Sequence, residues 1–154
     1  MFRKPLIVTL VALITFGSVF VSSEEAQANS VTQAANQAVQ QAHRFARLKS
    51  EQAGRLQSQL ASRQASFNAV VASGDAMRIK HAKAHFIVWL RSLRASLMEA
   101  KYAHDDLVRR LVYYRRVSGN NSVAGTINQV AAASARFQAT ANQISVRIAQ
   151  VAAA

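Results

Sequence analysis

The segment FIVWLRSLRASLMEAKYAHDDLVRRLVYY, residues 86–114, decides the fold. Apolar side chains recur in it at alternating steps of four and three residues, which places them along one side of an α-helix and is typical of coiled-coil-like packing. The positions of this seam are Phe86, Leu90, Leu93, Leu97, Ala100, His104, Leu107, Leu111 and Tyr114. The segment therefore predicts a long helix with one buried side.

Two other segments repeat this spacing. The C-terminal seam is interrupted only by Ser134, and its positions are Val123, Ile127, Val130, Ser134, Phe137, Ala141, Ile144, Ile148 and Val151. The N-terminal seam is weaker because Lys49 and Arg63 fall on it, and its apolar members are Leu56, Leu60, Phe67 and Val70. Gly54 lies within this segment and predicts either a bend or a close approach of two backbones.

Turn residues divide the chain into three helical parts. The only proline is Pro5, so no proline interrupts the later helices. The sequences SGD (73–75) and SGNNS (118–122) each combine a glycine that ends a helix with a residue that caps the next one. We therefore expect helices at about 30–72, 75–117 and 122–151.

These helices predict an all-α fold without strands. In a single helical domain covering residues 29–154, they would form an antiparallel three-helix bundle, or a coiled-coil-like helical hairpin plus a third helix. The heptad seams are also compatible with a homo-oligomer.

The N-terminal residues 1–28 have the organisation of a secretory signal peptide. A basic start precedes an apolar stretch over residues 6–21, and the small residues of the AQA tripeptide, 26–28, form a cleavage pattern. The apolar stretch is shorter than the roughly 20 residues of a membrane-spanning helix. We expect cleavage after Ala28, with Ser23 as the second choice and an uncleaved anchor as the alternative. The protein would then be secreted and extracellular, or periplasmic in a Gram-negative bacterium.

The chain is strongly basic, with 19 lysines and arginines against seven aspartates and glutamates and a formal net charge of +12. Two residues of each sign lie within residues 1–28, so the mature chain keeps 17 basic and five acidic residues. Such an excess attracts anionic surfaces, acidic proteins and polysaccharides in general, without selecting one of them. Since the chain contains no cysteine, it has no disulfide framework.

The octapeptide RRLVYYRR, residues 109–116, concentrates four arginines and two tyrosines. On a helix whose seam points inward, Arg109, Tyr113 and Arg116 project outward. Such a surface can hold an acidic partner through bidentate hydrogen bonds and cation–π contacts. These three residues are the predicted partner-binding site.

A purely structural interpretation of the same octapeptide is also available. Asp105 and Asp106 precede Arg109 and Arg110 by four residues, the favourable order for helix-stabilising ion pairs. The last two arginines suit the negative end of a helix dipole. The octapeptide would then be a solvated helix face.

The segment 78–94 allows a second interpretation. A basic stretch precedes the apolar FIVWL, a combination typical of a helix that lies on a membrane surface. The predicted membrane-contact residues are Val88, Trp89, Arg91 and Arg94. The alternative is a central bundle helix that touches two neighbours and leaves only Val88 exposed.

Residue types for metal binding or catalysis are sparse. His81 and His85 share one helix face, but Lys80 and Lys83 would repel a cation and no cysteine or nearby carboxylate completes a site. On the seam, we expect His104 to be a core histidine, with a pH switch as the alternative. No carboxylate pair with an evident cleft, glycine-rich phosphate loop or cysteine nucleophile occurs. We therefore expect no enzyme, metal or cofactor.

The sequence therefore predicts a small secreted cationic helical protein with a non-enzymatic binding or structural role. It would act through its basic surface and helix–helix contacts on an anionic or helical partner, and the alternative is a membrane-active, antimicrobial or toxin-like protein. Nucleic acid is not the expected partner in vivo, because export separates the chain from it. Asn120 begins an Asn-Asn-Ser glycosylation sequon, which is meaningful only in a eukaryotic secretory pathway.

Overall fold

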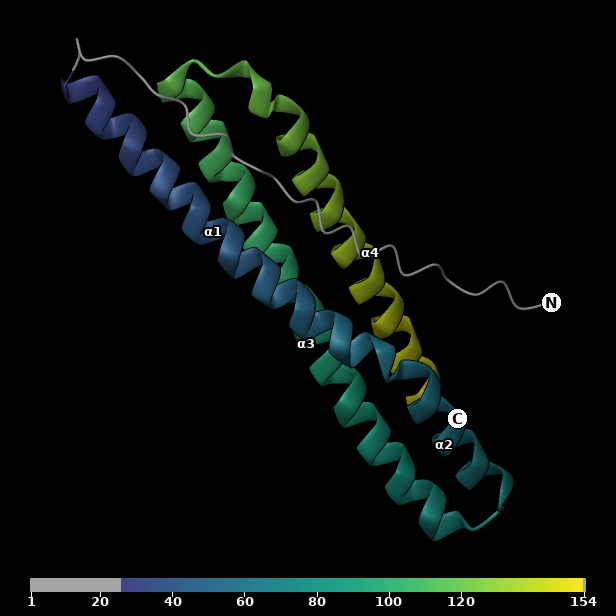
Figure 1. The fold of residues 1–154 in the computed structure, drawn as a ribbon. Helices are drawn as coiled ribbons and strands as arrows, with labels where there is room; N and C mark the ends of the chain where they lie inside the picture. Colours follow the sequence, from purple (N-terminus) through teal and green to yellow (C-terminus); the bar gives the residue numbers. More distant parts are fainter. Residues whose placement is uncertain (1–25, 154) are drawn as a thin grey trace.

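The computed structural model describes residues 26–153, in which helices pack against one another and no strand is present (Figure 1). The predicted all-α fold is confirmed. The predicted signal peptide, residues 1–28, lies outside the described residues except for its last three, which begin the first helix. The elements in chain order are α1 (Ala26–Ser58), α2 (Leu60–Ala72), α3 (Ala76–Ser118), the 3₁₀ helix η1 (Asn121–Val123) and α4 (Ala124–Ala153).

The predicted seams of α3 and α4 form most of the core. Leu90, Leu93 and Leu97 are completely buried, and every seam position of α3 is buried or half-buried. The same holds for the seam of α4, in which even Ser134 is buried. Each fully buried leucine contributes roughly 1.5–3 kcal/mol to stability, so the leucines of α3 are the largest single source of burial energy.

The seam of α1 extends further towards the N-terminus than predicted. The positions that continue it are all buried, and they are Ala35, Val39, Ala42, Ala46 and Ala53. Four of these five are alanines, which bury little apolar area. The N-terminal half of α1 is therefore held by a thin core.

The two basic residues on the α1–α2 seam are both accommodated by α3. Lys49 Nζ forms an ion pair with Glu99 Oε2 at 2.7 Å. The guanidinium of Arg63 lies 5.0 Å from the centre of the Trp89 ring. Long basic side chains can cover apolar surface with their stems while the charge stays at the edge. The seam therefore continues past both residues.

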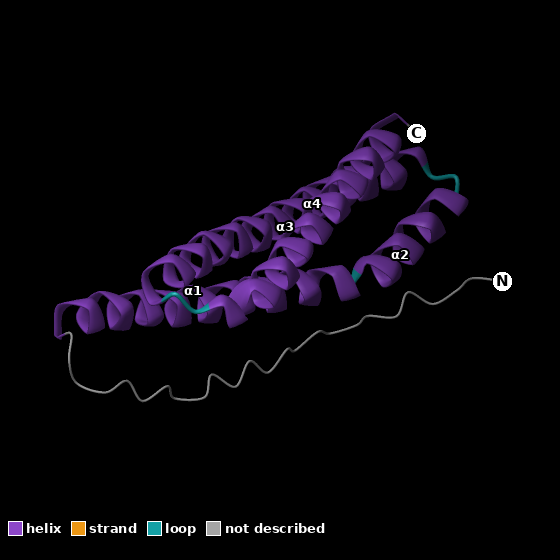
Figure 2. Ribbon diagram, turned by 90° about the horizontal axis from the view of Figure 1, so that it is seen from above, coloured by secondary structure: helices purple, strands orange, loops and turns teal. Residues whose placement is uncertain are grey.

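The first helical part is not one helix over residues 30–72, as predicted, but is interrupted at Gln59 (Figure 2). The backbone N–H of Gln59 bonds to the carbonyl of Leu56, one residue closer than in a regular α-helix. On either side, the hydroxyls of Ser58 and Ser62 donate to carbonyls three residues earlier. The break is therefore a single tight turn between two helices, flanked by these serine hydroxyl bonds. Gly54 lies four residues before the end of α1 and marks neither a bend nor a close approach.

Both predicted turns are present and use the predicted residues. Asp75 caps α3, because its carboxylate accepts hydrogen bonds from the backbone N–H groups of Met77 and Arg78 at 3.0 and 3.1 Å. Gly74 and Gly119 adopt φ values of 69° and 66°, the left-handed conformation that glycine adopts without strain.

The central element is α3, which packs against both α1 and α4. The Cα traces of α1 and α4 do not come within 8 Å of each other at any described residue. α4 runs antiparallel to α3, as shown by two contacts: Arg94 Nε donates to Ser145 Oγ at 2.7 Å, and Ser134 bonds to Asp105 further along α3. In this register Val151 joins the same apolar cluster as Phe86, so residues 76–85 of α3 extend beyond the end of α4 (Figure 1).

Two glycine substitutions test these backbone assignments. Gly54→Ala is expected to raise the free energy of unfolding by about 0.5–1 kcal/mol, because alanine favours helix over glycine. A Cβ at Gly54 would meet no atom within 4 Å.

Gly119→Ala is expected to lower the free energy of unfolding by about 1 kcal/mol or more, because the backbone at residue 119 has a positive φ. Urea unfolding followed by far-ultraviolet circular dichroism measures both, and a destabilised Gly54→Ala variant would contradict the helical assignment.

Candidate functional site

The side of α3 that faces away from α1 and α4 is exposed along its length and is called the outer face here. Its exposed apolar and aromatic members are Val88, Tyr102, Val112 and Tyr113. The three predicted partner-binding residues, Arg109, Tyr113 and Arg116, are all exposed and follow one another at steps of four and three residues on this face. The structure therefore brings the predicted residues together.

The ion pairs around Arg109 differ in part from those predicted. Asp106 binds both arginines, with 2.7 Å to Arg110 Nε and 3.7 Å to Arg109 Nη2. Asp105 does not pair with Arg109 but with Lys101. The predicted ion pair between Asp106 and Arg110 is thus confirmed. The predicted ion pair between Asp105 and Arg109 is wrong, because Asp105 pairs with Lys101 instead. One carboxylate for two arginines leaves this part of the outer face positively charged.

The last two arginines of the octapeptide are in different situations. Arg115 Nε donates to the Asn121 side-chain oxygen at 3.0 Å and so connects the end of α3 to η1. Within residues 26–153, the Arg116 side chain forms no ion pair and no hydrogen bond. Arg116 is therefore available to an external anion.

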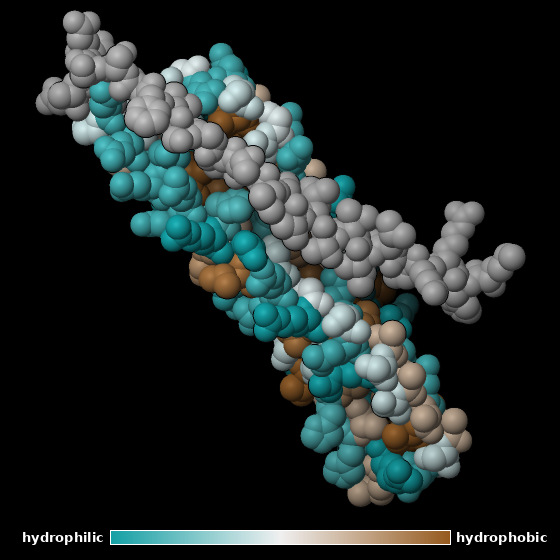
Figure 3. Space-filling view, in the orientation of Figure 1, coloured by the Kyte–Doolittle hydropathy of each residue, from teal (hydrophilic) through white to brown (hydrophobic). Residues whose placement is uncertain are grey.

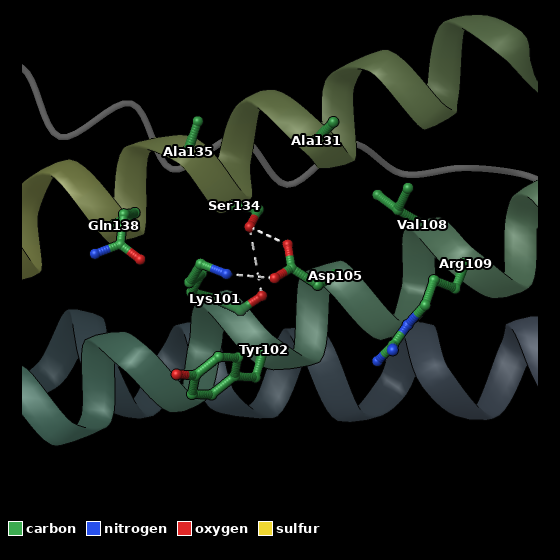
Figure 4. Close-up of a pocket in the computed structure, with 9 residues that line it drawn as sticks. All are labelled: Lys101, Tyr102, Asp105, Val108, Arg109, Ala131, Ser134, Ala135 and Gln138. Atoms are coloured by element: carbon green, nitrogen blue, oxygen red, sulfur yellow. Dashed lines mark hydrogen bonds and ion pairs between the residues drawn. The ribbon is translucent and has the colours of Figure 1, made fainter.

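A shallow groove of about 580 Å³ lies between α3 and α4 beside Arg109 (Figure 4). The side chains of Lys101, Asp105 and Ser134 meet in it: Ser134 Oγ donates to one carboxylate oxygen of Asp105, and Lys101 pairs with the other. Burial acts to raise the pKa of Asp105, but the bonds from Lys101 and Ser134 outweigh it and hold that pKa below the ordinary value. Asp105 thus stays charged and joins α4 to α3.

His104 lies at the same level of the bundle and faces α4. Its ring centre is 5.1 Å from that of Phe137, and Nδ1 donates to the Ala100 carbonyl at 2.8 Å. Burial lowers the pKa of His104, an effect that the bond to Ala100 and the charge of Asp105 oppose and that nearby His43 reinforces. A half-buried, neutral core histidine is the result.

The four predicted membrane-contact residues do not form one surface. Trp89 is only 9% exposed and stacks on Phe86 with 6.0 Å between ring centres, so it belongs to the core. Val88 and Arg91 are exposed on α3, and Arg94 is engaged by the Ser145 hydroxyl of α4. A membrane contact through Trp89 would require α3 to separate from its neighbours. No helix within residues 26–153 is both long and apolar enough to cross a membrane.

The remaining candidate residues make local contacts only. His81 and His85 are both exposed, and the described part of the chain holds no group of three or more metal-ligating side chains. Asn120 caps η1 through its side-chain oxygen, which accepts from the Ser122 N–H at 2.9 Å and the Ser122 hydroxyl at 2.7 Å. These bonds leave the Asn120 amide nitrogen, the atom that would carry a glycan, unused.

Comparison of the chain with protein-family models, curated proteins and solved structures finds no match.

The pKa of His104 gives a pH prediction. In the unfolded chain this imidazole takes up a proton near its ordinary pKa of 6.5, whereas the folded protein resists protonation. The unfolded state therefore binds more protons as the pH falls, so the contribution of His104 to stability is present above about pH 6.5 and is lost below it. We expect the melting temperature of the protein to decrease between about pH 7.5 and pH 5.5, and His104→Leu to decrease less. Equal decreases in both proteins would show that His104 is not responsible.

Proposed function

We propose that the protein is a small secreted cationic helical protein with a non-enzymatic binding role, and that the outer face of α3 binds an anionic partner. The observation that supports this most directly concerns the charges. All five acidic residues among residues 26–153 are engaged within the chain: Asp75 caps a helix, and the others form ion pairs. The acidic residues in ion pairs are Glu51, Glu99, Asp105 and Asp106.

Many basic side chains of the described residues, in contrast, have no partner within the chain. Those that form neither an ion pair, a hydrogen bond nor a ring contact are Arg44, Arg55, Arg78, Lys80, Lys83, Arg91, Arg116 and Arg136. An uncompensated positive field of this kind raises the local concentration of anions and accelerates their association.

The outer face near Arg109, Tyr113 and Arg116 is the part of this field best suited to a defined contact. Arginine offers paired N–H donors to carboxylate, sulfate or phosphate groups, and the exposed Tyr113 ring between the two arginines adds a stacking surface. Because α3 is held from two sides by α1 and α4, these side chains project from a rigid helix, which reduces the cost of ordering them on binding.

A paired substitution separates this site from the general effect of charge. Arg109→Gln with Arg116→Gln is expected to weaken binding to heparin, a sulfated polysaccharide probe, by about tenfold or more, because two charge-assisted contacts are lost. The far-ultraviolet circular dichroism should be nearly unchanged. Isothermal titration calorimetry at low and moderate salt measures the change.

The matched control is Arg44→Gln with Arg136→Gln. It removes the same net charge from exposed, unpaired positions of α1 and α4. If the control double variant weakens binding as much as the first, the outer face is not a site and only the net charge matters. If both leave heparin binding unchanged, the proposal is wrong.

A further inference from the structure

The hairpin formed by α2 and the beginning of α3 projects from the body of the protein. Residues 76–85 of α3 lie beyond the end of α4. The first part of α2 still reaches α4 through a side-chain hydrogen bond, in which Arg147 Nε donates to Gln64 Oε1 at 3.0 Å, but the α2 backbone does not come within 8 Å of α4 at any described residue. In Figure 1 the turn between α2 and α3 lies at the lower end of the described helices, past the end of α4. This end therefore consists of two helices where the rest has three.

Few apolar side chains are buried between the two helices of this hairpin. None of the α2 residues is fully buried, and the main contact with α3 is the stacked pair of Phe67 and Phe86, with 5.1 Å between ring centres. Beyond that pair, Val71 is 44% exposed and Met77 is 65% exposed, on either side of the turn. Figure 3 shows apolar residues gathered over α2 near the same end.

Basic residues lie close to this apolar tip. Arg78 lies in the first turn of α3, where the positive end of the helix dipole disfavours cations, and Lys80 and Lys83 follow in the next turn. The first turn of α3 contains no acidic residue, and the neighbouring Asp75 carboxylate is already occupied by two backbone N–H groups. The three cations also have no ion pair within the described chain.

We propose that this hairpin tip, defined as Val71, Met77, Arg78, Lys80 and Lys83, docks the protein onto an anionic lipid bilayer. Exposed apolar side chains at the end of a projecting turn can enter the boundary between headgroups and acyl chains, while neighbouring cations contact the lipid phosphates. A polysaccharide would satisfy the cations but offers no apolar phase to Val71 and Met77.

This docking site lies on a different surface from the outer face and goes beyond its anion binding. It shares the basic stretch of the segment 78–94 with the membrane contact predicted from sequence but differs in the apolar part, because Trp89 is buried whereas Met77 is exposed. If the tip contacts the bilayer, a probe at Met77 enters it and a probe at Val88 does not. If the segment around Val88 contacts the bilayer, the opposite is expected.

Single cysteines allow a direct test, because the chain contains none. Met77→Cys and Val88→Cys are each labelled with an environment-sensitive fluorophore and mixed with vesicles of phosphatidylcholine alone or of equal parts phosphatidylcholine and phosphatidylglycerol. The label at residue 77 should shift to shorter wavelength with the anionic vesicles only, and the label at residue 88 should not shift. A shift at residue 88 alone, or at neither position, would overturn the proposal.

A second measurement tests the cations. Arg78→Gln with Lys80→Gln should weaken sedimentation with the anionic vesicles by about 25-fold at low salt, since a basic residue near such a surface contributes about fivefold in affinity. Removing the charge of Arg78 from the first turn favours the helix, and Lys80 is exposed without an ion pair in the described chain, so unfolding does not explain such a loss. The matched control, Arg44→Gln with Arg136→Gln, should weaken it much less, and an equal loss would assign the binding to net charge and overturn the proposal.

The outer-face variant keeps the two proposals separable. Arg109→Gln with Arg116→Gln should reduce heparin binding and spare the vesicle binding. If it abolishes vesicle binding while the tip variant does not, the bilayer contacts the outer face and the tip proposal is wrong.

Discussion

The fold depends on the burial of α3 on two sides at once. Its central leucines are inaccessible to solvent, yet α1 and α4 do not approach each other within 8 Å along the described backbone. Each outer helix is therefore held mainly through α3 and not by the other. In a closed three-helix bundle each helix contacts both others, so three interfaces share the loss of packing energy when one core residue is changed. Here a change in the seam of α3 weakens both interfaces, and α1 and α4 have little with which to compensate.

Three of the four polar residues that interrupt the seams lie at one level of the bundle, and the fourth, Arg63, lies over Trp89. Lys49 of α1 pairs with Glu99, His104 faces Phe137, and Ser134 of α4 bonds to Asp105. This polar layer separates one apolar cluster around Leu97 from another around Leu107. A heptad seam rich in alanine presents nearly the same surface after a shift of seven residues. Apolar packing alone therefore only weakly defines which residues of two neighbouring helices lie opposite each other.

A shift of α4 along α3 would break the bond between Ser134 and Asp105. It would also place the Ser134 hydroxyl among leucines, where an unpaired polar group costs about 1–3 kcal/mol. The layer therefore reduces the apolar area that the core could bury but favours a single alignment of the helices, as a polar residue at a core position does in coiled coils.

The sequence predicts the parts of this fold that depend on large apolar side chains and on glycine. The seams of α3 and α4 and the turns at Gly74 and Gly119 were all predictable for that reason. The N-terminal seam of α1 was not, because alanine gives almost no contrast between a buried and an exposed face. The interruption at Gln59 is a single turn in which the Gln59 N–H bonds to the carbonyl three residues back, and the periodicity of apolar residues does not record such a turn.

The candidate sites could be predicted only in part, because some of their contacts depend on how the helices pack together. Which of Arg109, Tyr113 and Arg116 point outward follows from helix geometry alone. The burial of Trp89 does not, because the apolar stretch 86–90 covers all sides of the helix and only the position of α2 decides which side is covered. Asp105 pairs with Lys101 four residues before it and also accepts a hydrogen bond from Ser134 of α4, so spacing along the helix alone could not tell that it would turn away from Arg109.

The two ends of α3 carry similar charges under opposite physical conditions. Arg115 and Arg116 lie in the last turn, where the helix dipole favours cations, so their charge is compatible with a purely structural role. In the first turn, Arg78 opposes the dipole, and neither Arg78 nor Lys80 has an acidic partner in the described chain, so no structural reason for their charge is found there. The rise of a helix places Lys80 and Arg109 about 45 Å apart. Since charges in physiological salt are screened over about 8 Å, the tip and the outer face attract anions independently of each other. A rigid helix with two separated cationic surfaces can therefore keep two anionic partners apart.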